Sequence, residues 1–178
     1  MSNMSMRFFI ERCWSIVLPM IFLFSGCTLH NAAPSAKDAT DFLNQNRNEI
    51  DVVVDYLTEI ESGIICINDD DGMIFYNYEY HKILSNDLLS CINCLWRAGC
   101  KKISKENVQG TVTISFEIWS RTMGDADCGI ACTVDGQGKP ITEFQISCEP
   151  IDETWFYYFD DYEEYRQSQT QYDTGEDS

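Results

Sequence analysis

The stretch Gln109–Arg121 constrains the fold most, because its polar and apolar residues alternate cleanly from Thr111 to Ile118. One side of it carries the apolar residues Val112, Ile114, Phe116 and Ile118. The other side carries Thr111, Thr113, Ser115 and Glu117. Successive side chains of a strand point to opposite faces, so this pattern predicts a strand with one buried face and one polar face. Such strands are typical of an antiparallel sheet that is covered on one face.

Two segments have apolar residues at helical spacing. They are Asp38–Glu61 and Asn86–Ala98, and each is expected to form an amphipathic helix. Gly63 and Gly99 follow them, as residues that end helices often do, and Ser85 is placed to cap the second helix.

Further strands are expected around the second helix. They are residues 63–68, 73–80, 127–134, 141–148 and 154–159. Asp69–Gly72 ends in an Asp-Gly pair, which is typical of a hairpin turn between the first two. We therefore expect an α+β fold with two helices packed on one antiparallel sheet of about six strands, the last four forming a meander. The same order of elements is compatible with a curved sheet that resembles those of cystatins and nuclear transport factors.

Residues 1–26 resemble the export signal of a bacterial lipoprotein. Arg7 and Arg12 accompany an apolar stretch, Trp14–Phe24, that is about half the length of a membrane-spanning helix. The four residues from Phe24 to Cys27 are similar to a lipobox, although Phe24 stands where Leu is usual. The resemblance implies cleavage before Cys27 and a diacylglyceryl anchor on its sulfur. An ordinary secretory signal or a short uncleaved anchor is the alternative.

The resemblance also implies a location and a domain order. The protein would be lipid-anchored in the cell envelope, at the outer membrane in a host with two membranes, because Thr28 rather than Asp follows the cysteine. Residues 27–37 are expected to hold the lipidated cysteine and a flexible tether. Residues 38–166 would form a single α+β domain, and residues 167–178 an acidic disordered tail.

The charge of the chain is strongly negative. It has 12 Lys and Arg against 29 Asp and Glu, a net charge of −17, and removing a signal that carries +1 leaves −18. This charge repels nucleic acid and anionic lipid headgroups, so a nucleic-acid partner is not expected. It favours a basic protein partner, while solubility alone also explains much of it.

No pattern of a known catalytic site was found, and no cofactor or metal is expected. Cys91-Ile-Asn-Cys94 has the spacing of zinc and redox sites, but it falls within a predicted helix. A structural disulfide or buried thiols are the simpler interpretation. His81 is the one histidine of the predicted domain and has no marked partner. Seven cysteines remain after the signal and the anchor, and the sequence does not decide their pairing: Cys66, Cys91, Cys94, Cys100, Cys128, Cys132 and Cys148.

An aromatic run near the C-terminus is the candidate partner surface. Alternation along the strand Thr154–Phe159 puts one set of its aromatic residues in the core and the other on the surface. Exposed Tyr and Trp are typical of binding hot spots, and acidic residues follow the run. The candidate residues are Trp155, Tyr157, Tyr158, Tyr162 and Tyr165. The alternative is a strand covered on both faces by its own domain.

The C-terminal third resembles a family of small bacterial α+β proteins. The matching segments are Gly129–Thr133, Gly138–Pro140 and Trp155–Tyr158, although Cys132 replaces an aromatic residue. Some members are immunity-like partners of toxins, so the resemblance implies binding rather than catalysis. We expect a lipid-anchored, acidic, non-enzymatic binding protein that acts as an immunity- or adaptor-like partner of a basic protein. A small-ligand pocket protein and a thiol enzyme or redox protein are the alternatives.

Overall fold

The computed structural model describes residues 32–61, 64–67, 73–83, 85–121 and 125–173. Residues 33–178 form one compact unit. The described helices are α2 (Ala36–Gln45), α3 (Arg47–Glu59), α4 (Asn86–Arg97) and α5 (Tyr162–Asp173). The strands are β1 (Ile64–Ile67), β2 (Met73–Tyr76), β3 (Glu79–Lys82), β4 (Lys102–Val108), β5 (Thr111–Ser120), β6 (Ala126–Thr133), β7 (Gln145–Pro150) and β8 (Phe156–Asp161). The predicted α+β class is confirmed, but two helices and about six strands is only a rough count, because the described residues contain four helices and eight strands.

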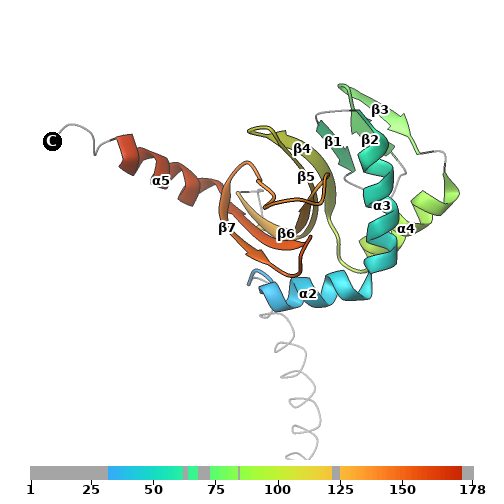
Figure 1. Ribbon diagram of the computed structural model, residues 1–178, viewed down its shortest axis with the longest axis horizontal. Coiled ribbons are helices and arrows are strands. Elements are labelled where there is room, and N and C mark those ends of the chain that lie inside the picture. Colours follow the sequence, from blue (N-terminus) through green and yellow to red (C-terminus); the bar gives the residue numbers. More distant parts are fainter. Residues whose placement is uncertain (1–31, 62–63, 68–72, 84, 122–124, 174–178) are drawn as a thin grey trace, which may run out of the picture. The chain divides into compact units, whose positions relative to one another are not determined.

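All eight strands belong to one antiparallel sheet in the order β3-β2-β1-β4-β5-β6-β8-β7. The sheet curves strongly through β4, β5, β6 and β7 (Figure 1). The expected meander of the last four strands is wrong, because β8 lies between β6 and β7. β7 is polar and ends at Pro150, which suits an edge strand, whereas β8 is buried on both faces.

One face of the sheet forms the hydrophobic core with α2, α3 and α4. Each of these helices buries three apolar residues, and those of the sheet come mainly from β1, β4, β5 and β6. Phe116 and Ile114 of β5 are fully buried there. The strict alternation of β5 therefore predicted its core face correctly.

The first predicted helix is two helices, and it begins earlier than expected. Ser35 and Asp38 form a capping box that starts α2 at Ala36, inside the segment expected to be a tether. Asn46 then interrupts the helix, since its side-chain amide donates to the Phe42 carbonyl at 2.8 Å and its ψ is 18°. The second predicted helix is confirmed as α4, with the Ser85 hydroxyl accepting from the Leu88 amide.

β4 was missed, and the strand predicted at residues 73–80 is two strands, β2 and β3, because these sequences do not alternate cleanly. β3 is a polar edge strand, and the turn before it has Asn77 and Tyr78 at positive φ without a glycine. β4 places Lys105 on the core face, where an apolar residue would be expected.

Lys105 is only 5% exposed and joins the sheet to a helix end. Its ammonium donates to the carbonyl oxygens of Leu57 at 2.9 Å and Ile60 at 2.6 Å, at the C-terminus of α3. The last carbonyls of a helix lack partners within the helix, so Lys105 takes the role of a C-cap and compensates the negative end of the dipole.

Replacing Lys105 with methionine is expected to lower the free energy of unfolding by about 1–2 kcal/mol, because the carbonyls of Leu57 and Ile60 lose their donor. Urea denaturation measures this. Lys102→Met is the matched control on the same strand: the Lys102 side chain is 41% exposed and its ion pair with Glu106 spans 4.0 Å, so its loss should be smaller. Equal losses in the two variants would contradict the capping role.

The C-terminal segment is ordered further than the sequence suggested. Residues 167–173 belong to α5 instead of a disordered tail, and α5 points away from the sheet (Figure 1). Its polar composition hid the helix, because α5 has no apolar face of its own to bury. Residues 174–178 lie outside the described residues.

The predicted signal, Cys27 and the Asp69–Gly72 turn also lie outside the described residues. Among the helices that are described, none is long and apolar enough to cross a membrane.

Candidate functional site

The face of the sheet opposite the helices is polar over four neighbouring strands. Alternation along β4, β5, β6 and β8 brings their polar residues together on this face, as the strand register shows. These residues are Lys102, Ser104, Glu106, Thr113, Ser115, Glu117, Asp127, Thr133, Tyr158 and Asp160. Several are nonetheless buried, including Ser104, Thr113 and Asp160. Something must therefore cover this face.

The cover is a segment between β6 and β7, Pro140–Phe144, which we call the strap. The Thr113 hydroxyl donates to the Ile141 carbonyl at 3.0 Å, and the Ile141 amide lies 3.1 Å from the Thr113 oxygen. The Thr142 hydroxyl donates to Asp160 at 2.5 Å. The Asp161 amide donates to the Phe144 carbonyl at 3.2 Å. Side chains of the sheet thus hold the strap in place.

The side chain of Phe144, at the end of the strap, is held by aromatic contacts. Its ring makes edge contacts with Tyr162 and Tyr165 of α5, at centroid distances of 5.0 and 5.9 Å. Edge-to-face contacts of this kind are favourable by about 0.5–1.5 kcal/mol beyond the area that they bury. α5 therefore helps to fix the strap, although it lies beside the sheet and not on it.

A cavity of about 200 Å³, the polar cavity, lies between the strap and the sheet. Its lining is mainly hydrophilic, with several carboxylates and one ammonium group. The lining residues are Lys102, Ser104, Glu106, Ser115, Glu117, Asp127, Thr142, Glu143, Phe144, Tyr158 and Asp160. A hollow with convergent polar groups is the usual form of a small-ligand site.

Two carboxyl groups of the polar cavity lie directly opposite each other. Asp127 of β6 pairs with Asp160 of β8, so their side chains share one face of the sheet. Burial, and then the charge of Glu117, raise the pKa of Asp127 to about 6. Burial also raises the pKa of Asp160 to about 7, with Asp127 adding to the effect and Thr142 opposing it. Both groups therefore titrate near neutral pH.

The remaining polar groups fix the geometry of the polar cavity. The Tyr158 hydroxyl donates to Asp127, and burial with the neighbouring acids holds its pKa well above the usual range. The hydroxyls of Ser104 and Ser115 lie 2.8 Å apart in a hydrogen bond. Lys102 faces Glu117 across β4 and β5. The arrangement can hold a polar ligand and can accept or release protons.

A second hollow is a less suitable site. It is an open groove of about 460 Å³ at the ends of β5 and β6, lined mainly by turn residues and small side chains. Lys139 and Asp135 are its charged residues. It is larger, but its polar side chains do not converge as they do in the polar cavity.

Three of the five predicted surface residues are buried, which corrects that prediction. Trp155, Tyr157 and Tyr158 are 4%, 7% and 3% exposed, so β8 is covered on both faces. Tyr157 lies in the core and donates to the Pro34 carbonyl at 2.8 Å. Tyr158 lines the polar cavity. Only Tyr162 is exposed, while Tyr165 is partly buried.

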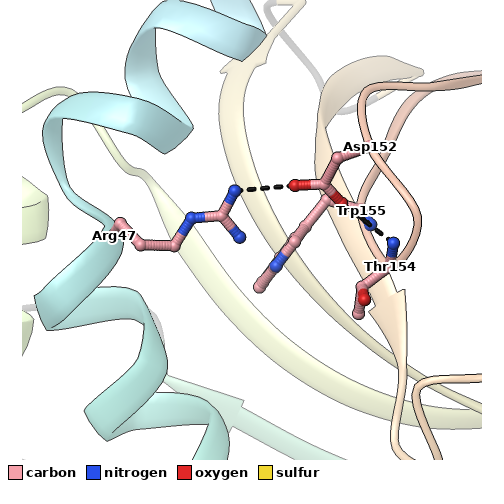
Figure 2. Close-up of polar contacts among 4 residues, drawn as sticks. All are labelled: Arg47, Asp152, Thr154 and Trp155. Atoms are coloured by element: carbon pink, nitrogen blue, oxygen red, sulfur yellow. Dashed lines mark hydrogen bonds and ion pairs between the residues drawn. The ribbon is translucent and has the colours of Figure 1, made fainter.

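Trp155 is held in the core by a polar cluster at the turn between β7 and β8 (Figure 2). The Arg47 guanidinium forms an ion pair with Asp152 at 2.7 Å and lies 5.9 Å from the centroid of the Trp155 ring. Asp152 also accepts from the backbone amides of Thr154 and Trp155. These contacts join the start of α3 to the turn before β8 and stabilise the packing of Trp155.

The cysteines form no disulfide among those for which the structure gives a state: Cys91, Cys94, Cys100, Cys128, Cys132 and Cys148. Desolvation raises the pKa of Cys91, the first cysteine of the predicted zinc or redox pair. It also raises the pKa of Cys128 to about 11 and of Cys132 to about 12. Reactive cysteines need a lowered pKa, which favours the thiolate.

His81, the other residue considered for catalysis, packs against an aromatic side chain. Its ring stacks on that of Tyr76, with the two ring centroids 3.9 Å apart.

Comparison of the chain with protein families, curated proteins and solved structures finds no match. The fold and the cavity thus define a class only: an α+β protein with a curved antiparallel sheet and a polar cavity on one face. Sequence reasoning missed Asp127, Asp160 and Glu117 as site residues. The polar side of β5 was visible, but an alternating strand is equally typical of a solvated face.

Proposed function

We propose that the protein is a non-enzymatic binding protein of the bacterial cell envelope that takes a small polar ligand into the polar cavity. Lipid on Cys27 would hold it at the membrane. The observation that carries the proposal is a polar sheet face that is covered by its own strap and yet leaves a hollow of about 200 Å³. A polar ligand in this hollow would meet several converging side-chain groups.

The arrangement favours binding over thiol chemistry. The pKa values of Cys91, Cys128 and Cys132 are raised by burial, which disfavours the thiolate. The polar cavity itself contains no cysteine and no histidine. Its acids suit the recognition of a ligand.

Association with a basic protein is the second candidate function. The net charge of −17 favours it, as does the exposed acidic start of α5, where Glu163 and Glu164 follow the exposed Tyr162. Such binding would weaken with salt. A pull-down with the chain as bait, eluted by a salt gradient, tests this candidate.

Filling the polar cavity tests the first function. We expect Ser115→Leu to weaken the binding of any ligand found by NMR screening of small polar compounds by at least about tenfold, ~1.4 kcal/mol. The added side chain would enter the hollow that Ser115 lines. Ser90→Leu, on the exposed side of α4, is the matched control and should bind like the wild type. Thermal unfolding of both variants without ligand checks that they are folded.

Equal affinity of Ser115→Leu and the wild type for such a ligand would place its site elsewhere. The absence of any ligand that perturbs the cavity residues would remove the proposed function.

A further inference from the structure

The charges around the polar cavity are strongly unbalanced. Glu106, Glu117, Asp127, Glu143 and Asp160 line it, and the single basic group there belongs to Lys102. Lys102 lies 4.0 Å from Glu106, so it is already engaged with one of the acids. Like charges in direct cross-strand opposition destabilise a sheet, as at Asp127 and Asp160. The cavity therefore has an excess of acidic groups in its lining.

The shape of the cavity favours an organic cation. Within the described residues, no three His, Cys, Asp or Glu side chains are grouped closely enough to hold one metal ion. The carboxylates are instead spread around a volume of about 200 Å³. The hydroxyls of Tyr158 and Ser115 add acceptors, and the Phe144 ring adds an apolar wall. This is the chemistry that recognises an alkylammonium group.

We propose that the polar cavity binds a small organic ammonium ion, and that the Asp127–Asp160 pair releases a proton to solvent when the ion enters. This inference rests on the proposed binding function of the same cavity. Without ligand, one proton on this cross-strand pair of carboxyls reduces their repulsion. When the ammonium enters, it takes over the positive charge that this proton supplied. One cation is taken up, and up to one O–H bond of a carboxyl is broken as its proton passes to solvent. No other covalent bond changes.

The carboxylates that face this pair from each neighbouring element act in the same direction. Glu106 of β4, Glu117 of β5 and Glu143 of the strap are acidic, and Lys102 of β4 opposes them. Burial raises the pKa of both members of the pair, so the pair carries about one proton near pH 6–7. An ammonium among these acids stabilises the ionised carboxylates and lowers their affinity for protons.

The test is a pH titration of the side-chain carboxyl carbon signals of Asp127 and Asp160 by NMR. It uses the full-length chain in a non-ionic detergent, with and without saturating n-butylammonium chloride. We expect the ammonium to lower the proton affinity of the pair about tenfold, and 1-butanol, its neutral counterpart, to leave it unchanged. A parallel titration with N-acetyl-lysine amide distinguishes the sources of the ammonium. If N-acetyl-lysine amide binds as tightly as butylammonium, the ligand is the side chain of a lysine. If it binds more weakly, the ligand is a free amine. Either result supports the proposal.

Asp160→Asn is the informative variant, because its side-chain oxygen can still accept from Thr142. We expect it to bind butylammonium about tenfold more weakly and to release no proton. Asp55→Asn, on the exposed side of α3, removes one charge outside the cavity and should match the wild type. In the ligand-free protein a raised carboxyl pKa makes stability fall as pH rises from the ordinary range, near 4, to about 7. Asp160→Asn should reduce this fall, which confirms that the variant is folded and that the pair titrates.

Three outcomes separate this inference from the function on which it rests. Binding of butylammonium with no change in the titration of either aspartate would overturn the proton release. Binding of neutral polar compounds without butylammonium would overturn the cationic ligand and leave the binding function intact. If no compound perturbs the cavity residues, the binding function and this inference both fail.

Discussion

Replacing Gly129 with alanine is expected to lower the free energy of unfolding by about 3 kcal/mol, and the melting temperature by about 10 °C. A Cβ atom on Gly129 would lie 2.0 Å from the backbone oxygen of Phe116 and 3.0 Å from the Cα of Glu117. Both are main-chain atoms of β5, so a rotamer change cannot relieve the overlap. The pairing of β5 and β6 shifts register next to this point, between Glu117 and Trp119, and glycine permits that close approach.

The adjacent position on the same face provides the control. Ala131→Gly makes the reverse change in β6 and removes only a methyl group, so it should cost about 1 kcal/mol. Thermal and urea unfolding measure both variants. If Gly129→Ala lowered the free energy of unfolding by less than Ala131→Gly does, β5 and β6 would be able to move apart at Gly129 without a loss of stability.

Replacing Trp155 with alanine is expected to cost about 4 kcal/mol of stability, because a large buried side chain leaves a cavity. Trp155 is 4% exposed, and its ring lies 5.9 Å from that of Phe116 between centroids. The Arg47 guanidinium covers it from the side of α3 (Figure 2). Urea denaturation gives the free energy, and the circular dichroism of aromatic groups reports the lost packing.

Tyr162→Ala is the contrasting aromatic variant, because Tyr162 is 45% exposed. It loses the edge contact with Phe144 and should cost less than about 1 kcal/mol. The pair of variants separates a core role from a surface role. If Trp155→Ala kept wild-type stability and Tyr162→Ala did not, the assignment of these two aromatic residues would be reversed.

Several elements could be predicted because a few neighbouring residues, such as an alternating run or a capping serine, determine them. The alternation of β5 determined which of its residues enter the core, and Ser85 marked the start of α4. β4 was missed, and β3 was not separated from β2, for an equally physical reason. β3 carries polar side chains because it is an edge strand. In β4, Lys105 lies on the core face, where it caps α3, and so it interrupts the alternation of apolar residues.

The candidate site could be predicted only in part. The polar side of β5 was evident, but whether water or another segment covers such a side depends on residues far away in the chain. Thr113 and Ile141 meet across 28 positions, and Thr142 reaches Asp160 from another element. The prediction of Trp155, Tyr157 and Tyr158 as surface residues failed for the same reason. Tyr158 lies in the polar cavity beneath the strap, and Trp155 and Tyr157 belong to the hydrophobic core.

The sequence by itself determined the α+β class, the apolar and polar faces of β5 and the large negative charge. Periodicity within a segment and the composition of the chain do not depend on how the segments are arranged in space. The tertiary structure alone decided that β8 lies between β6 and β7 and that the strap covers the polar face. It also decided that Asp127 and Asp160 face each other. Strand order and cross-strand pairs are set by which long-range contacts bury the most apolar area and satisfy the most polar groups, and no short window of sequence contains that balance.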